Sequence, residues 1–294
     1  MDTLVLLTIT GLGLGAMYFL IASGLSLIYG LMGVLNFAHG AFLTVGAYAT
    51  WYAETKLTGI GSVPLRFLVS ALVGLAVGAV FAALVELVLI RPLYNRHIEQ
   101  VLVTVGLGLA TTALVQAIWG ADARTVAVPS WAGDTTTILG AAIPNDRFVE
   151  IATAIVVLVG IQAFLRKTRY GLIIRAGVEN RAMVTALGID VRKAFTLVFA
   201  IGGLAAALAG VLSGVYFGTV EPARGTSLLI FAFIVVVIGG LGSIGGSAAA
   251  AVVVGLVQQY ANYYASSGLG DLSVVLLLGI VLLVRPRGLS GAFA

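Results

Sequence analysis

Apolar residues recur along the chain in long blocks that short polar stretches separate. A helix needs about 20 mostly apolar residues to cross a bilayer, and each block reaches about that length. The blocks are residues 3–30, 36–53, 67–90, 101–119, 148–165, 194–217 and 225–284. The last block has room for three crossings with a break at Ile238–Ser247. The pattern predicts an all-α integral membrane protein, a polytopic bundle of about 8–9 transmembrane segments with glycine-broken helices.

Composition supports this class. Of the 294 residues 60% are hydrophobic and only 10% are charged, and mean hydropathy is +1.12, whereas soluble domains are about a quarter charged. The longest polar stretches, 120–147 and 166–193, are shorter than the roughly 50 residues of a separate domain, so 1–294 is expected to be one transmembrane domain. Asp2 and the lack of a basic leader favour a permanent first helix over a cleaved signal. The absence of cysteine excludes disulfides and thiolate metal sites, and we expect no metal and no cofactor.

Charge placement gives an orientation. Loops that stay in the cytoplasm near membrane spans retain Lys and Arg. Seven of the 16 basic residues fall in 166–193, so this loop is expected inside and the N-terminus outside. The net charge of +4 is then a signal of topology in the lipid membrane, and nucleic acid is not expected as a partner.

The polar stretch "NFAHG" interrupts the first 50 residues, which otherwise lack charge beyond Asp2. We expect it to form a turn near the inner interface, with a second span beginning around Phe42. Its side chains can cap free helix ends or contact a solute passing between helices. The residues alone favour the turn over a contact with a solute. The candidate path residues are Asn36, Phe37, His39 and Gly40.

A second interruption carries five glycines within 239–246, each weakening a helix by about 1 kcal/mol relative to alanine. It is either a broken helix lining a pathway or a plain loop between two spans. Its candidate path residues are Gly240, Gly242 and Ser243. "GLGSIG" matches a dinucleotide motif only formally, because the strand and helix context of that motif is missing, and no lysine follows a glycine as a Walker A loop requires. The chain is therefore not expected to be an ATPase.

Glu86 is interpreted as the only carboxylate within a span, about 7.5 Å of helix rise from Arg91, from where it is expected to snorkel to the inner surface. A proton-coupled secondary transporter of a small neutral solute remains the alternative function, although a proton relay needs more ionisable partners. An intramembrane serine protease would need a Ser and a His on facing helices. Ser23, Ser26 and His39 all lie in the first two spans.

Three stretches carry a family resemblance. "GLSLIYGLMGVLNFAHGAFLTVGAY" (24–48) resembles the signature region of permease subunits of branched-chain amino acid ABC importers. Residues 175–212 are similar to their coupling-loop region, and "GGLGSIGGSAAAAVVVGL" with "VRPRGLSG" matches their C-terminal part. The resemblance implies a permease domain in a bacterial or archaeal inner membrane. It also implies a second related permease, two cytoplasmic ATPase subunits and an extracytoplasmic binding protein as partners.

The resemblance further implies that 166–193 is a cytoplasmic coupling loop whose helix docks into a cleft on an ATPase. The coupling residues would be Arg175, Glu179, Asn180, Arg181, Ala182 and Gly188. From the residues themselves, a helix of 176–187 is expected after a flexible "YGL", with Gly188 as its C-terminal stop. A short helix of mixed polarity suits a partner's groove or a place under lipid headgroups. The sequence does not separate branched-chain amino acids from urea or short amides as the solute.

Overall fold

The computed structural model of the chain describes residues 2–94, 96–179, 181–188, 190–266 and 268–290. The long elements are α1 (Asp2–Met32), α2 (His39–Lys56), α3 (Val63–Val85), α4 (His97–Trp119), α6 (Asn145–Lys167), α9 (Val191–Phe217), α10 (Arg224–Gly239), α11 (Ile244–Tyr264) and α12 (Leu269–Val284). The short elements are the π-helical turn η1 (Glu86–Ile90), the 3₁₀ turn η2 (Arg91–Leu93), α5 (Ser130–Gly133), α7 (Arg169–Glu179), α8 (Arg181–Ala186) and the strands β1 (Arg124–Thr125), β2 (Thr135–Ile138), β3 (Ala141–Pro144) and β4 (Thr219–Val220).

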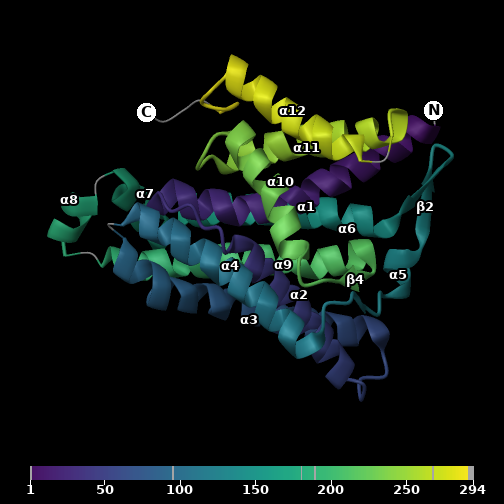
Figure 1. Ribbon diagram of the computed structural model, residues 1–294, viewed down its shortest axis with the longest axis horizontal. Coiled ribbons are helices and arrows are strands. Elements are labelled where there is room, and N and C mark those ends of the chain that lie inside the picture. Colours follow the sequence, from purple (N-terminus) through teal and green to yellow (C-terminus); the bar gives the residue numbers. More distant parts are fainter. Residues whose placement is uncertain (1, 95, 180, 189, 267, 291–294) are drawn as a thin grey trace.

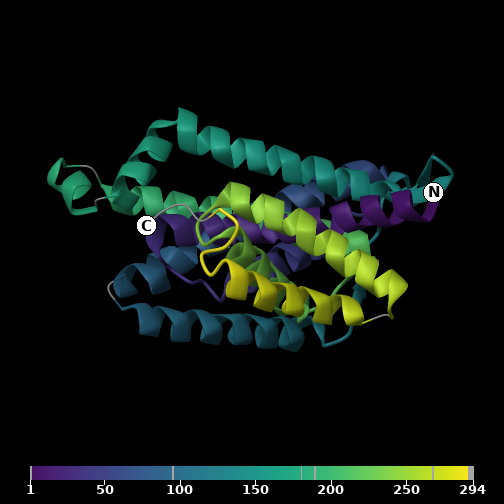
Figure 2. The same ribbon diagram turned by 90° about the horizontal axis from the view of Figure 1, so that it is seen from above.

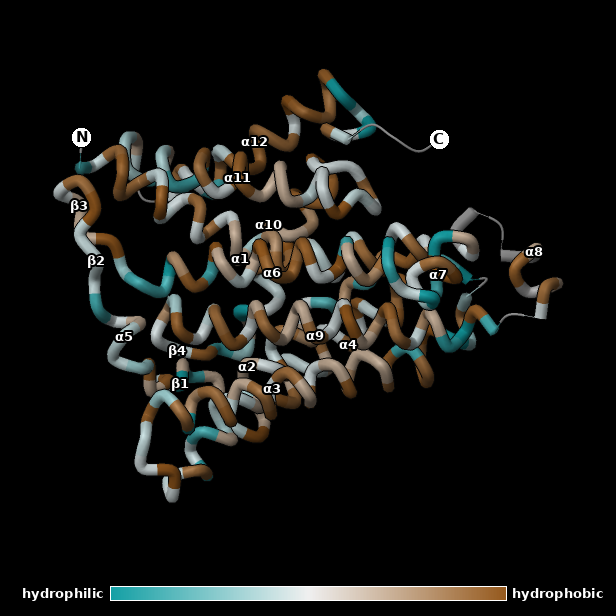
Figure 3. Tube along the Cα trace, turned by 180° about the vertical axis from the view of Figure 1, so that it is seen from behind, coloured by the Kyte–Doolittle hydropathy of each residue, from teal (hydrophilic) through white to brown (hydrophobic). Residues whose placement is uncertain are grey.

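Two helices form the centre of the bundle. α1 packs against α11, α9, α6 and α10, and α9 packs against α3 and α2, as Figures 1 and 2 show. α1 and α9 are largely buried, whereas α4 and α6 are largely exposed although they are apolar. Hydrophobic residues run along the helices, and hydrophilic ones gather toward the two ends of the bundle (Figure 3). Exposed apolar helices of this kind are stable only where lipid covers them.

The membrane class predicted from the sequence is therefore confirmed. Within the described part of the chain, six helices are long and apolar enough to cross a membrane: α1, α3 with its continuation to Leu93, α4, α6, α9 and α11. α10 and α12 are apolar but have 16 residues each, and α2 has 18. The block 225–284 does divide into three helices, and the predicted break falls between Gly239 and Ile244.

The two ends of the bundle differ. At one end lie the N-terminus, α5 and the strands, and at the other lie α7 and α8 (Figure 1). β2 and β3 form an antiparallel hairpin, while β1 pairs with β4 through the registers Arg124↔Val220 and Thr125↔Thr219. The β1–β4 pair joins the segment after α4 to the segment after α9. This pairing holds together two connections, the one that follows α4 and the one that follows α9, at the end of the bundle opposite α7.

Helix contacts depend on glycine at several crossings, and one of these is where α2 meets α10. A side chain at Gly40 would meet the backbone of Gly225, and one at Gly225 would meet the carbonyl oxygen of Gly40 and the hydroxyl of Thr44. Small residues let membrane helices approach backbone to backbone. Because both glycines stand at the first turn of their helices, the beginnings of α2 and α10 touch.

The loop 166–193 differs from its prediction in two respects. The single helix expected over 176–187 is two helices, because α7 ends at Glu179 and α8 spans Arg181–Ala186. Its first helix begins at Arg169, so Tyr170, Gly171 and Leu172 are helical and do not form a flexible linker. The Thr168 hydroxyl accepts a hydrogen bond from the Gly171 amide at 2.9 Å, which caps the new helix. The predicted stop is confirmed, because Gly188 follows α8 with a φ of +78°, the left-handed conformation that ends many helices.

Candidate translocation path and coupling elements

The turn that carries Asn36 and His39 lies deep in the bundle. After α1 ends at Met32 the chain runs back along α1, so that His39 Nε2 lies 3.1 Å from the carbonyl oxygen of Ile21. Ile21 precedes Met32 by 11 residues, about 16 Å of helix at 1.5 Å per residue. Both polar side chains are fully buried. The predicted position near the inner interface was wrong, because a hydropathy pattern does not show that a connection retraces its helix.

Asn36 and His39 both take part in hydrogen bonds that form the start of α2. Asn36 Oδ1 accepts a hydrogen bond from the Ala38 amide at 3.0 Å, and the His39 amide donates to the Asn36 carbonyl at 3.2 Å. The predicted turn is thus present. Asn36 Nδ2 and His39 Nδ1 nevertheless have no hydrogen-bond partner among the described residues. A buried polar atom without a partner costs about 1–3 kcal/mol, so two of them at one helix start leave hydrogen-bonding capacity unused inside the bundle.

The closest surroundings of this turn include residues of α1 and α10. The His39 ring fits only because residue 24 is glycine, since a Cβ there would lie 2.8 Å from His39 Cε1. Phe37 packs against Phe233 of α10 with ring centroids 4.9 Å apart, and Gly40 contacts Gly225. The positively polarised N-termini of α2 and α10 therefore meet inside the bundle. Broken helices present such N-termini to the anionic groups of solutes in membrane transporters.

The second group of predicted path residues, Gly240, Gly242 and Ser243, lies at a different place from the turn that carries Asn36 and His39. Gly240, with a φ of +98°, and Gly242, with a φ of +83°, form the turn between α10 and α11. Ser243 caps α11 by accepting a hydrogen bond from the Gly246 amide at 3.0 Å. A Cβ at Gly242 would lie 2.7 Å from the Cα of Gly30, which is two residues from the end of α1.

The chain end covers this turn, because the Leu289 amide donates to the Ile238 carbonyl at 2.7 Å. The structure therefore matches the plain-loop alternative for Gly240, Gly242 and Ser243. It does not bring these three residues together with Asn36 and His39. Gly242 lies beside Gly30 near the end of α1, whereas His39 lies beside Ile21, nearer the middle of α1.

The predicted coupling residues are placed only in part. Arg175 is exposed on α7, and Gly188 follows α8. Asn180 and the side chains of Glu179, Arg181 and Ala182 lie outside the described residues. Their contact with an ATPase stays a prediction. The placement of α7 and α8 beyond one end of the bundle (Figure 1) is the position that such a contact requires.

The structure reveals a polar cluster that the sequence did not indicate. Glu86 is fully buried. It receives hydrogen bonds from Arg91 Nε and Nη2, both at 3.2 Å, from the Thr196 hydroxyl at 2.7 Å, and from the Tyr94 hydroxyl. The prediction that Glu86 snorkels to the surface was wrong. The π-helical turn Glu86–Ile90 explains this, because its i to i+5 backbone bond brings Arg91 level with Glu86.

Next to this Glu86 cluster lies a group of apolar side chains that joins α8 to α9. Val184 of α8 is buried together with Val191 and Phe195 of α9, and Tyr94 packs on the same group. The Tyr94 and Phe195 rings meet edge to face at 5.6 Å. A continuous set of contacts thus joins α8 to Glu86 and the C-terminal end of α3.

Glu86 is also not the only carboxylate within a span. Glu150 lies in the second turn of α6 and is 1% exposed. It went unnoticed because a single acidic residue near the end of an apolar block hardly changes the hydropathy of the block. The structure shows that α6 begins before this residue, at Asn145.

A bundle of glycine-packed apolar helices, with a helix start buried inside it and a helical loop beyond one end, is the architecture of a membrane permease. Residues 7–285 match the family described as branched-chain amino acid transport system / permease component, and the chain belongs to this family.

Three relatives cover nearly the whole chain. The high-affinity branched-chain amino acid transport system permease protein BraD of Pseudomonas aeruginosa is 30% identical, over 96% of this chain and 94% of its own length. The corresponding LivH protein of Escherichia coli K12 is 31% identical over 96% and 93%. A probable LivH protein of Methanocaldococcus jannaschii is 30% identical over 92% and 88%. No solved structure matches the chain.

Proposed function

We propose that this chain is the transmembrane permease subunit of an ATP-driven importer of branched-chain amino acids or related small amides. The observation that carries the proposal is the family match over 7–285, together with relatives that are named as branched-chain amino acid permeases over nearly their full lengths. This match favours the importer over a proton-coupled secondary transporter. The subunit forms the translocation path, and separate ATPase subunits hydrolyse ATP.

The family and the charge pattern support a set of partners and an orientation. We infer a second related permease, two cytoplasmic ATPase subunits and an extracytoplasmic binding protein. The end with α7 and α8 faces the cytoplasm, because 166–193 holds seven basic residues. The N-terminus is then outside. Nine crossings follow if α2, α10 and α12 all span the bilayer in addition to the six longer helices, and eight follow if two of the three do.

The buried start of α2 supports a position for the path. A solute with an anionic group is attracted to the meeting N-termini of α2 and α10, where Asn36 Nδ2 can donate a hydrogen bond. Apolar neighbours such as Phe37 and Phe233 accept an aliphatic side chain. These residues provide binding and a gate, and no covalent chemistry is required.

A route for energy coupling follows from the contacts of α8. Movement of the ATPases shifts α8, and Val184 passes the shift to Phe195 and Tyr94. Glu86 bonds both Tyr94 and Thr196, so α3 and α9 move together. Because α9 also packs on α2, its displacement alters the surroundings of His39.

The proposal is tested at the coupling loop. Arg181→Glu reverses a charge on α8, and like charges at a desolvated contact cost several kcal/mol. We expect the variant to insert normally, because the loop lies outside the bilayer, but to lose at least tenfold in retained ATPase. The measurement is co-purification of the ATPases with the permease. Wild-type retention together with wild-type stimulation of hydrolysis would remove Arg181 from the contact.

A second prediction concerns the path. Asn36→Leu removes the Nδ2 donor and the bond to Ala38, so we expect uptake to fall at least tenfold while the complex still assembles. The matched control is Asn262→Leu, which removes turn bonds to the Gly268 and Gly270 amides at another place. Each lost bond costs about 1 kcal/mol, so both variants express somewhat less. Normal uptake per assembled complex in Asn36→Leu would show that Asn36 is only a turn residue.

A further inference from the structure

Basic side chains gather at the end of the bundle that carries α7 and α8. The stretch 166–193 holds seven Lys and Arg residues against two acidic residues. Six of the seven have described side chains, and all six are exposed: Arg166, Lys167, Arg169, Arg175, Arg192 and Lys193. None of these six forms a salt bridge with a residue that the structure describes. Their charges therefore attract anions to this end of the bundle.

One of these cations lines an open pocket of about 360 Å³ between α7 and α9. Tyr170 of α7 and Lys193 of α9 border the pocket, and both are exposed. Leu197 and Ala200, which are half-buried, line it further along α9. Ala200 follows Lys193 by seven residues, about 10 Å of helix at 1.5 Å per residue. The pocket thus runs from an end with an ammonium and a phenol to an apolar end.

The long axis of this pocket follows a helix that crosses the membrane. α9 is among the six helices that are long and apolar enough to do so, and Lys193 stands in its first turn. Lysine and tyrosine are favoured where the apolar part of a bilayer meets the headgroups. The end with Lys193 and Tyr170 therefore lies at the level of the headgroups, and the end with Leu197 and Ala200 lies at the level of the acyl chains.

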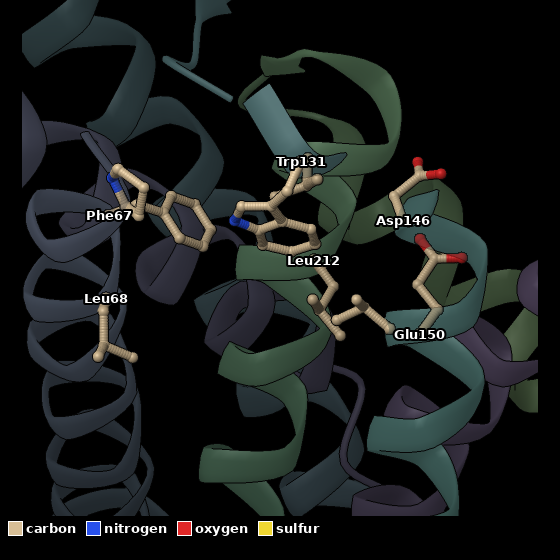
Figure 4. A pocket seen from close by; sticks show the side chains of 9 residues that line it. Phe67, Leu68, Trp131, Asp146, Glu150 and Leu212 are labelled. Atoms are coloured by element: carbon tan, nitrogen blue, oxygen red, sulfur yellow. The ribbon is translucent and has the colours of Figure 1, made fainter. Parts of the chain in front are cut away.

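The pocket at the other end of the bundle has the opposite character. It is lined by apolar side chains and by the acidic Asp146 and Glu150, and no described basic residue lines it (Figure 4). An anion is therefore attracted to the pocket beside α7 and repelled from the pocket of Figure 4.

The rule that basic residues stay in cytoplasmic loops explains the charges of 166–193, but it does not explain the pocket. That rule needs basic residues anywhere in the loop, whereas here a lysine and a tyrosine from two helices share one cavity with an apolar end. A free anion such as inorganic phosphate would use Lys193 and leave the apolar side chains uncovered. A phospholipid matches both parts, because its acyl chain covers apolar surface and its phosphate accepts charge-assisted hydrogen bonds.

We propose that this pocket binds an anionic phospholipid from the leaflet that meets α7. Lys193 and the Tyr170 hydroxyl donate hydrogen bonds to its phosphate, and its acyl chain lies along Leu197 and Ala200. The other cations of 166–193 attract the headgroup without touching it. The proposal goes beyond the importer function, since it assigns lipid binding to α7 and the start of α9 and leaves α8 for coupling. Thr196 lines the same pocket and bonds Glu86, so the lipid lies beside the Glu86 cluster.

The test is native mass spectrometry of the purified chain in detergent, titrated with phosphatidylglycerol to obtain the dissociation constant of the first bound lipid. Lys193→Gln keeps much of the side-chain length but removes the charge, and we expect it to weaken binding at least fivefold. The matched control is Lys167→Gln, which removes the same charge from an exposed lysine of 166–193 that does not line the pocket. We expect this control to weaken binding less than twofold. Phosphatidylcholine, which has no net charge, is expected to bind wild type and both variants equally weakly.

A second variant tests the apolar end of the pocket without changing any charge. Ala200→Leu fills the space beside Leu197, so we expect it to weaken phosphatidylglycerol binding at least fivefold as well. Inorganic phosphate is expected not to displace the lipid. Each variant should elute from size-exclusion chromatography at the wild-type position, because the substituted side chains are exposed or half-buried.

Three results would overturn the proposal. Equal losses in Lys193→Gln and Lys167→Gln would show attraction by diffuse charge, with no site at the pocket. Equal affinity of the wild type for phosphatidylglycerol and phosphatidylcholine would remove the selection for an anion. Displacement by inorganic phosphate would show that the acyl chain contributes nothing. The readout needs no ATPase, so it does not depend on the importer function.

Discussion

Gly225→Ala is expected to destabilise the purified subunit by about 1–3 kcal/mol or more. The new methyl group would meet the Gly40 carbonyl oxygen and the Thr44 hydroxyl, so α2 and α10 must separate at their first turns. Backbone cannot move aside as a side-chain end can, and the strain therefore spreads along both helices. The measurement is the temperature at which half of the protein leaves the monodisperse peak in size-exclusion chromatography. Uptake should fall too, because the Asn36 and His39 turn borders this contact.

The chain offers a matched control for this prediction. Gly279 of α12 has no neighbouring atoms within 4 Å of a built Cβ, so Gly279→Ala adds the same methyl group in open space. Alanine favours a helix over glycine by about 1 kcal/mol, and we expect unchanged or slightly raised stability. Equal melting temperatures for Gly225→Ala and Gly279→Ala would contradict the backbone contact between α2 and α10.

Glu86→Ala is expected to uncouple transport from ATP hydrolysis. The change leaves Arg91, Tyr94 and Thr196 without their shared acceptor. Removing one partner of a buried pair costs about 3–5 kcal/mol, and because the Arg91 side chain is 32% exposed we expect the lower end. In complexes that still assemble, the bond between Glu86 and Thr196 of α9 is missing. A movement of α9 is then no longer transmitted to α3. The measured quantity is solute imported per ATP hydrolysed, which should drop at least fivefold.

Conservative changes keep this prediction distinct from simple unfolding. Glu86→Gln retains the shape and acceptor oxygen, so it should recover much of the melting temperature and part of the coupling. Thr196→Val keeps Glu86 and its bonds to Arg91 and Tyr94 but removes the Thr196 hydroxyl, which bonds Glu86 Oε2, Arg91 Nη2 and the Arg192 carbonyl. It should lower the import per ATP with a smaller loss of stability than Glu86→Ala. If Glu86→Ala melts early but imports normally per ATP, the Glu86 cluster serves the fold alone.

The membrane class, the division of the last block into three helices and the stop at Gly188 were predicted correctly, because each depends on local composition. Apart from the helix boundaries within 166–193, the errors concern polar residues within the helix bundle. Glu86 was expected to reach the surface, yet a π-helical turn aligns it with Arg91. Glu150 was missed, and Asn36 and His39 were placed near an interface. In each case the outcome depends on which distant helix supplies the partner, and no local pattern encodes that.

By itself the sequence determined that this chain is a helical membrane protein, how its apolar blocks are spaced, and which loop holds the basic residues. These properties follow from the free energy of moving each segment from water to lipid, which depends on composition alone. Only the tertiary structure decided that the chain after Met32 returns to Ile21 and that Gly40 meets Gly225. The reason is that helices associate in lipid by close packing and hydrogen bonding between segments far apart in sequence. The depth of a polar side chain is therefore set by the neighbours of its helix.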